Sequence, residues 1–141
     1  ASVKVQFLCY WICNKVYYAS NDGSIGTKGF VTEPLTELLE KGETYDLVIA
    51  IGPLPMMKAV CDITKKYGIK TNVSLNPIMI DGTGMCGGCR VTVGNETKFA
   101  CVDGPDFDGH LVNFEEAIKR QGMYKEEEHK CRMGSEVNHA K

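Results

Sequence analysis

The sequence Asp81-Gly-Thr-Gly-Met-Cys86-Gly-Gly-Cys89 is followed, after eleven intervening residues, by Cys101. The ligand spacing of plant-type 2Fe–2S proteins is C-x4-C-x2-C…C, and this stretch has the same spacing with aspartate in the first position. A cluster loop must approach the metal closely and aim backbone N–H groups at the sulfurs, which glycine allows. The stretch therefore predicts a 2Fe–2S cluster bound by Asp81, Cys86, Cys89 and Cys101. Because aspartate is a harder donor than thiolate, it would shift the reduction potential relative to a four-cysteine cluster.

Other kinds of site fit part of this pattern. A structural zinc ion would take the three cysteines together with Asp81 or His110, although the second C-x2-C pair of a zinc ribbon is missing from the sequence. A thiol redox motif would need a helix after the cysteine pair, whereas residues 90–93 have the pattern of a strand. For the same reason the G-x-G-x-x-G match at residues 82–87 is not a dinucleotide fingerprint. The zinc site stays open as the alternative.

The composition is that of an ordinary globular chain. Hydrophobic residues make up 43% and charged residues 24% of the 141 residues, and the net charge is −2. This balance favours neither nucleic acid nor an anionic membrane as a partner. The seven cysteines are an odd number, which indicates reduced thiols or metal thiolates in the cytoplasm rather than a secreted disulfide framework. The apolar run at residues 3–13 is too short to span a bilayer.

The first part of the chain alternates between strand and helix patterns. Strands are expected at residues 15–20, 45–51 and 69–75, and helices at 33–41 and 55–68. This order predicts a parallel sheet with flanking helices, in which residues 45–51 form a strand buried on both faces. Residues 1–14 are apolar enough to be a buried strand. The fold class is therefore α/β.

The second part of the chain is organised differently. Residues 90–93 and 97–102 flank a Gly94-Asn95 turn and predict a hairpin, which would return Cys101 to the other cysteines. A turn-rich loop at 103–110, a helix at 113–121 capped by Asn113, and a frayed tail are expected to follow. A boundary near Asn76 would divide a nucleotide-binding α/β domain, residues 1–75, from a cysteine-rich hairpin extension with a C-terminal helix, residues 76–141.

Two loops are candidates for ligand binding because each follows an expected strand. Ligands of open α/β folds bind at the carboxyl ends of the strands, where residues 22–29 and 52–57 would lie. Two adjacent loops of this kind predict one extended ligand across the strand ends. A plain turn in the first loop and core packing of Met56 and Met57 in the second are the alternatives.

Several of these segments together resemble the small subunits of NADH-dependent ferredoxin:NADP+ oxidoreductases, also known as sulfide dehydrogenases. More distantly they are similar to the electron-transfer subunits of dihydroorotate dehydrogenase and of cytosolic NAD(P)-linked hydrogenases. The resemblance covers roughly residues 16–121. The segments that carry it are Asn-Asp22-Gly-Ser-Ile-Gly-Thr-Lys-Gly, Ile-Gly52-Pro-Leu-Pro-Met-Met, Ser-Leu-Asn-Pro-Ile-Met-Ile-Asp81-Gly-Thr-Gly-Met-Cys-Gly-Gly-Cys-Arg and Phe-Ala-Cys101-Val-Asp-Gly-Pro-Asp-Phe-Asp-Gly-His.

The resemblance implies an order of parts: an FAD-binding barrel, an NAD(P)-binding domain like that of ferredoxin reductases, and a 2Fe–2S segment. It assigns the four predicted ligands to the cluster, including the aspartate. The residues that it places at NAD(P) are Asp22, Gly23 and Ser24 on the nucleotide side, and Gly52, Pro53 and Met56 near the nicotinamide. The chain has no R-x-Y-S/T flavin motif and no glycine-rich first half of the nucleotide domain. It is therefore expected to be a C-terminal fragment without the flavin barrel.

The expected function is that of an oxidoreductase electron-transfer subunit in the cytoplasm. Electrons would pass between NAD(P)H, FAD and a partner through the 2Fe–2S cluster. The resemblance implies a larger flavin and iron–sulfur subunit, hydrogenase subunits or ferredoxin as partners, and neither nucleic acid nor membrane. By itself, the chain is expected not to oxidise NAD(P)H, because it lacks flavin. The alternative is a nucleotide-binding module with a structural zinc ion and no redox activity.

Overall fold

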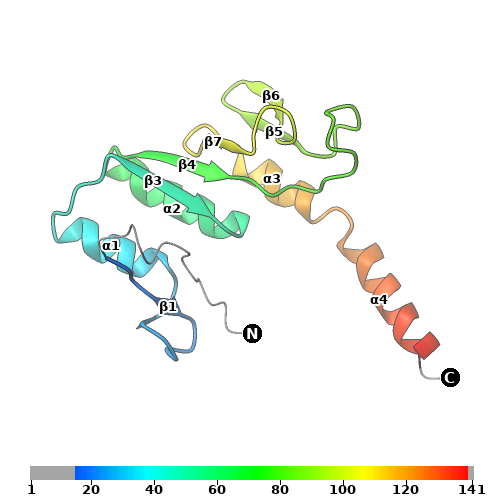
Figure 1. The fold of residues 1–141 in the computed structure, drawn as a ribbon, viewed down its shortest axis with the longest axis horizontal. Helices are drawn as coiled ribbons and strands as arrows, with labels where there is room; N and C mark the ends of the chain where they lie inside the picture. Colours follow the sequence, from blue (N-terminus) through cyan, green and yellow to red (C-terminus); the bar gives the residue numbers. More distant parts are fainter. Residues whose placement is uncertain (1–14, 140–141) are drawn as a thin grey trace.

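The fold is built around a three-stranded sheet with a helix on one face (Figure 1). The structure is a computed structural model that describes residues 15–139. Strands β3 (Leu47–Ile51) and β4 (Lys70–Ser74) are parallel neighbours, and helix α2 (Leu54–Lys66) connects them. Strand β7 (Asp106–Asp108) pairs antiparallel with the other edge of β4. The two halves of the chain therefore share one sheet.

Smaller elements lie on either side of this sheet. They are β1 (Ala19–Ser20), β2 (Thr27–Lys28) and α1 (Thr32–Glu40) before it in the chain, and β5 (Arg90–Val93), β6 (Glu96–Phe99), α3 (Phe114–Gln121) and α4 (Lys125–His139) after β4. Strands β5 and β6 form an antiparallel hairpin, and α3 packs against α2 and β5. Helix α4 extends away from the other elements (Figure 1). None of the helices in the described part of the chain has the length and apolar character needed to cross a membrane.

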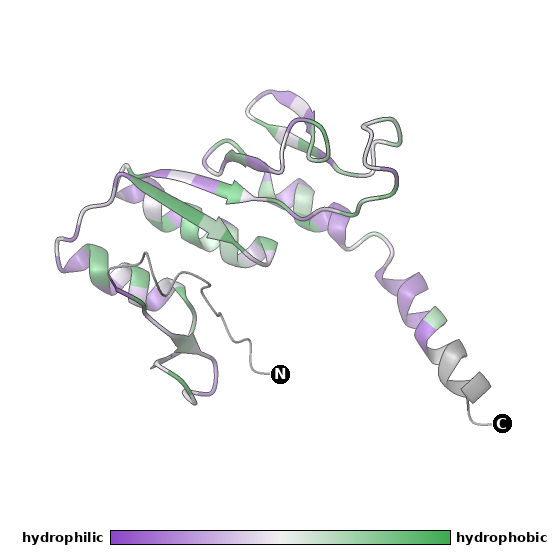
Figure 2. Cartoon of the chain, viewed as in Figure 1, coloured by the Kyte–Doolittle hydropathy of each residue, from purple (hydrophilic) through white to green (hydrophobic). Residues whose placement is uncertain are grey.

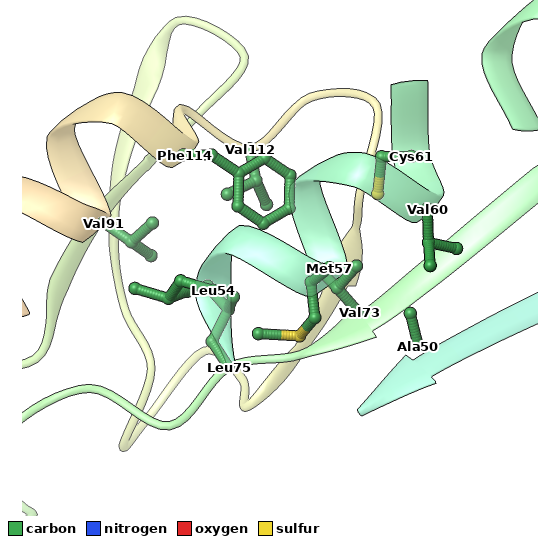
Figure 3. Close-up of a cluster of buried hydrophobic side chains, with 10 residues drawn as sticks. All are labelled: Ala50, Leu54, Met57, Val60, Cys61, Val73, Leu75, Val91, Val112 and Phe114. Carbon is green, nitrogen blue, oxygen red and sulfur yellow. The ribbon is translucent and has the colours of Figure 1, made fainter. Parts of the chain in front are cut away.

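One hydrophobic core joins the sheet to the hairpin and to α3 (Figure 3). Met57 on α2 and Val73 on β4 are fully buried, and Val91 of the hairpin and Phe114 of α3 belong to the same cluster. The buried residues of this cluster are Ala50, Leu54, Met57, Val60, Cys61, Val73, Leu75, Val91, Val112 and Phe114. Because these residues come from both halves of the sequence, burial of this core fixes the hairpin relative to α2.

Most of the expected elements are present, and the α/β fold class is confirmed. The two helices and two strands predicted for residues 33–75 occur with small shifts at their ends. The hairpin is also present, and Gly94 in its turn has a φ of 62°, a conformation that suits glycine. Asn113 caps α3 as predicted, because its side chain accepts a hydrogen bond from the Glu116 N–H at 3.1 Å.

Two predictions about strands were wrong. The strand expected at residues 15–20 is reduced to β1, which pairs with β2 in a separate sheet because the following loop folds back and the Thr27 N–H bonds to the Tyr18 carbonyl at 2.8 Å. Strand β7 lies in the segment predicted as a loop. Its three residues carry too little pattern to be recognised, and its pairing with β4 bridges a long separation in sequence.

Two further predictions were wrong, one about the burial of β3 and one about the C-terminal tail. Strand β3 was expected to be buried on both faces, but only one face meets α2, and Ile49 and Ile51 on the other are 63% and 70% exposed. Figure 2 shows this strand as almost uniformly hydrophobic. The tail expected to fray contains α4, whose acidic first turn suits a helix N-terminus. The strand predicted at residues 1–14 lies outside the described residues.

The core makes a prediction about stability. Met57→Ala removes a fully buried side chain and leaves a cavity, so we expect it to lower the free energy of unfolding by about 2–5 kcal/mol. Urea denaturation followed by circular dichroism measures the change. Met79→Ala is the control, because Met79 is 51% exposed and its loss should cost less than about 0.5 kcal/mol. Equal losses in the two variants would show that the core does not depend on Met57.

Candidate metal centre and nucleotide loops

The segment between β4 and β5 is an irregular loop that contains Asp81, Cys86 and Cys89. Its start is held by a hydrogen bond from the Leu75 N–H to the Pro105 carbonyl at 3.0 Å. Two glycines are required by its geometry. Gly87 has a φ of 68°, and Gly84 has a φ of 84° with Val102 so near that a Cβ would lie 2.9 Å from its Cγ2. Side chains at these positions would strain the backbone or displace Val102.

Cys89 and Cys101 meet where the hairpin begins and ends. Cys89 directly precedes β5, and Cys101 follows β6 by two residues, so the closing hydrogen bond from the Ala100 N–H to the Cys89 carbonyl brings them together. Their sulfurs are 3.2 Å apart, and the Cys89 thiol donates to the Cys101 sulfur. This hydrogen bond, together with burial, raises the pKa of Cys101. A metal ion between the two sulfurs would replace the shared proton and favour both thiolates.

Asp81 and Cys86 lie on the outer part of the loop. The Asp81 carboxylate accepts the Thr83 N–H at 2.8 Å with one oxygen and the Cys86 N–H at 3.0 Å with the other. These hydrogen bonds lower the pKa of Asp81, and the bond from the Thr83 N–H has the largest effect. Cys86 is exposed, and its sulfur accepts the Gly88 N–H at 3.3 Å. The carboxylate is therefore ionised and ordered at neutral pH.

The predicted ligands thus occur as one sulfur pair and two neighbours on the loop. Among residues 15–132, whose side chains the structure describes, no three Cys, His, Asp or Glu side chains converge in a geometry ready for a metal ion. Two sulfurs nevertheless accept backbone N–H groups: Cys86 from Gly88, and Cys89 from Cys101 at 3.5 Å. Such N–H donors are what an iron–sulfur loop must supply, so these residues fit the group. His110, the alternative zinc ligand, instead lies 3.1 Å from Thr64 on α2.

Arg120 contacts the loop, a role that the sequence pattern did not predict. Its guanidinium Nη2 donates to the carbonyls of Gly87 and Gly88 at 3.2 and 3.4 Å. Its Nε is buried and has no hydrogen-bond partner in the described part of the chain, which costs about 1–3 kcal/mol. The only signal in the sequence is that all three arginines, Arg90, Arg120 and Arg132, lie at or after the cysteine loop.

The two candidate nucleotide loops lie in different sheets. Gly52 follows β3 and Pro53 precedes α2, so this loop is at the carboxyl end of a parallel strand as predicted. Asp22, in contrast, follows β1, which pairs among the described strands only with β2. The two loops therefore do not share one sheet edge, and the prediction that they do was wrong. Asp22 accepts the Ser24 N–H at 3.0 Å and the Ser24 hydroxyl at 2.7 Å. The backbone N–H bond is the first cause of its lowered pKa.

Comparison with known proteins identifies the cysteine segment. Residues 76–113 match the family model for the iron–sulfur cluster binding domain of dihydroorotate dehydrogenase B. This segment is similar to that domain. It includes Asp81, all three cysteines of the candidate centre and β7.

Longer similarities extend over most of the chain. A Clostridium beijerinckii protein described as an uncharacterized protein in the adh 3′ region is 58% identical over 119 residues, which are 84% of this chain and 40% of that protein. A Thermotoga maritima homolog of the dihydroorotate dehydrogenase B (NAD(+)) electron transfer subunit is 48% identical over 80% of this chain and 40% of its own length.

A solved structure shows the same relationship. A chain from the structure of NADH-dependent reduced ferredoxin-NADP oxidoreductase, described in connection with flavin-based electron bifurcation, is 50% identical with a TM-score of 0.70. The match covers 76% of this chain and 38% of that one. This chain is a relative of both groups of electron-transfer proteins. It spans about two fifths of the length of these relatives.

The hydrogen bonds of Asp22 predict a pH dependence. Because the folded pKa lies below the ordinary value of 3.8, the Asp22–Ser24 turn is stabilised above about pH 3.8 and is lost as pH falls through the lower folded pKa. The chemical shift of the Ser24 amide, followed by NMR during an acid titration, should have its midpoint below 3.8. Asp22→Asn should remove this titration. A midpoint at or above 3.8 would contradict the hydrogen bonds.

Proposed function

We propose that the cysteine segment binds a 2Fe–2S cluster through Asp81, Cys86, Cys89 and Cys101. The observation that carries the proposal is the 3.2 Å approach of the Cys89 and Cys101 sulfurs, inside a segment that matches an iron–sulfur binding family. Two sulfurs at this separation can bind one metal ion. Cys89 and Cys101 would then hold one iron, and Cys86 and Asp81 the other.

The surroundings of Asp81 support its role as a ligand. Each carboxylate oxygen accepts a single N–H group, so each keeps a lone pair for a metal. The carboxylate is ionised at neutral pH, and its lowered pKa keeps it ionised under more acidic conditions than an ordinary aspartate. A bound cluster supplies one-electron chemistry, and this chain's residues contribute the ligands, the N–H donors to sulfur and the position of the loop on the hairpin.

We further propose that the whole protein is an NAD(P)-linked oxidoreductase of the ferredoxin-NADP+ type. The relatives named for electron transfer and for ferredoxin-NADP oxidoreductase support this proposal. NAD(P) would contact two loops, one formed by Asp22, Gly23 and Ser24 and the other by Gly52, Pro53 and Met56, and FAD would bind in another part of the whole protein. The Gly52 loop is supported by its position at the end of β3.

The same relatives support a proposal for the partners and the cellular location. Electrons would pass between NAD(P)H, FAD and a larger flavin and iron–sulfur subunit, with ferredoxin or hydrogenase subunits as further partners. The cysteines of the described residues are free thiols and not disulfides, which favours the reducing environment of the cytoplasm. A division near Asn76, with the nucleotide domain at residues 1–75 and the cluster extension at residues 76–141, remains our proposal. The pairing of β7 with β4 would join the two.

A structural zinc site is the second candidate, because the Cys89–Cys101 pair also suits zinc. Metal content distinguishes the two. After anaerobic purification and reconstitution, the parent chain should contain about two iron and two acid-labile sulfide per chain and absorb in the visible range. Stoichiometric zinc without sulfide, together with failed iron reconstitution, would contradict the cluster and leave a structural role.

Cysteine variants test which residues bind the metal. Cys101→Ser breaks the sulfur pair, so we expect it to lose most of the iron and sulfide. Cys131→Ser is the matched control, because Cys131 is exposed on α4, and it should keep the parent content. Iron and sulfide assays on both variants give the answer. Retention of the full cluster in Cys101→Ser would remove Cys101 from the ligand set.

A second substitution tests the aspartate. Asp81→Cys exchanges a carboxylate for a thiolate at the same ligand position, so the cluster should form but with a changed absorption spectrum and reduction potential. A redox titration compared with the parent measures the change. If both properties equal those of the parent, Asp81 is not a ligand.

A further inference from the structure

Arg120 joins helix α3 to the cysteine loop, although the two are more than thirty residues apart in the chain. Its Nη2 group donates to the carbonyl oxygens of Gly87 and Gly88, which lie between Cys86 and Cys89. No salt bridge or other hydrogen bond of this side chain is present within residues 15–132, where side chains are described. The positive charge of Arg120 is therefore directed at the backbone of this loop.

One peptide group links Arg120 to a cysteine sulfur. The Gly87 carbonyl and the Gly88 N–H belong to the same peptide unit, and this unit is trans because the described cis bond is between Gly104 and Pro105. The C=O and N–H of a trans peptide point in opposite directions. Since Arg120 holds the carbonyl at 3.2 Å, the N–H on the other side is directed at Cys86 Sγ, 3.3 Å away.

The surroundings strengthen this link. Arg120 lines a small cavity of about 40 Å³ whose walls are mostly apolar, with Leu54, Leu75, Ile80 and Val91 among them. No acidic side chain lines the cavity. In such surroundings a charge acts over a given distance more strongly than in water. The buried Nε without a partner also shows that the guanidinium is held there at a cost to stability.

We propose that Arg120 is a positioning residue that aims the Gly88 N–H at Cys86 Sγ and so raises the reduction potential of the cluster. This inference rests on the proposed cluster. Reduction by one electron adds one negative charge, and both an N–H donor to sulfur and a nearby cation stabilise the more negative state. Without Arg120 the Gly87 carbonyl keeps only the weaker hydrogen bond from the Arg90 N–H at 3.4 Å. The Gly87–Gly88 peptide is then held less firmly, since Gly87 allows many backbone conformations.

Two variants separate the charge of Arg120 from its hydrogen bonds. Arg120→Gln removes the charge, and Arg120→Lys keeps the charge but loses the planar fork. Lys119→Gln is the matched control, because it removes one positive charge from an exposed position of the same helix. The first measurement is a redox titration of the reconstituted full chain. The second is hydrogen exchange of the Gly88 amide in the metal-free chain, which does not depend on the cluster.

We expect Arg120→Gln to lower the equilibrium constant for cluster reduction about tenfold, which is 59 mV for one electron. Arg120→Lys should show a smaller decrease, and Lys119→Gln a change below about twofold, because an exposed charge is screened. Gly88 should exchange faster in both Arg120 variants and at the parent rate in Lys119→Gln. Arg120→Lys keeps the test valid if Arg120→Gln does not fold.

Other outcomes would overturn the proposal. If Arg120→Gln changes the equilibrium constant no more than Lys119→Gln does, Arg120 has no special effect on the potential. If Gly88 exchange is unchanged in Arg120→Lys, the arginine does not position the peptide. A parent chain that takes up no iron and sulfide would refute the proposed cluster and with it the effect on the potential, and Gly88 exchange would still decide the positioning role.

Discussion

The packing of α2 between β4 and α3 holds this structure together. Met57 and Val73 are fully buried there, and Val91 and Phe114 bring the hairpin and α3 into the same core. Because the chain reaches the hairpin only through an irregular loop, hydrophobic burial rather than local structure fixes the position of the cysteines. The pairing of β7 with β4 adds backbone hydrogen bonds to the same junction.

This junction explains how a glycine-rich loop is held in one geometry. The loop has few side chains of its own to pack, so its geometry depends on fixed points around it. The hairpin supplies Cys89 and Cys101 at its open end, and α3 supplies Arg120. Asp81 supplies the third point by accepting two backbone N–H groups. A loop held in this way can present N–H groups to sulfur with little reorganisation.

The two loops proposed to contact NAD(P) differ in how the fold supports them. The Gly52 loop lies between β3 and α2, two elements of the core layer, whereas the Asp22 loop belongs to a separate two-stranded sheet. One face of β3 also remains exposed, with Ile49 and Ile51 open to solvent. Parallel sheets are usually covered on both faces. The hydrophobic pattern of β3 therefore predicts burial on both faces, whereas this structure buries only one of them.

The sequence by itself determined the ligand spacing, the glycines of the loop, the hairpin turn, the cap at Asn113 and most elements between residues 33 and 121, because these depend on local backbone and side-chain chemistry. Only the tertiary structure decided the separate sheet of β1, the strand β7, the pairing of the Cys89 and Cys101 sulfurs, and the contact of Arg120 with Gly87. Each of these joins residues distant in sequence or competes with a local pattern, and such choices are made by burial and backbone hydrogen bonding across the whole fold.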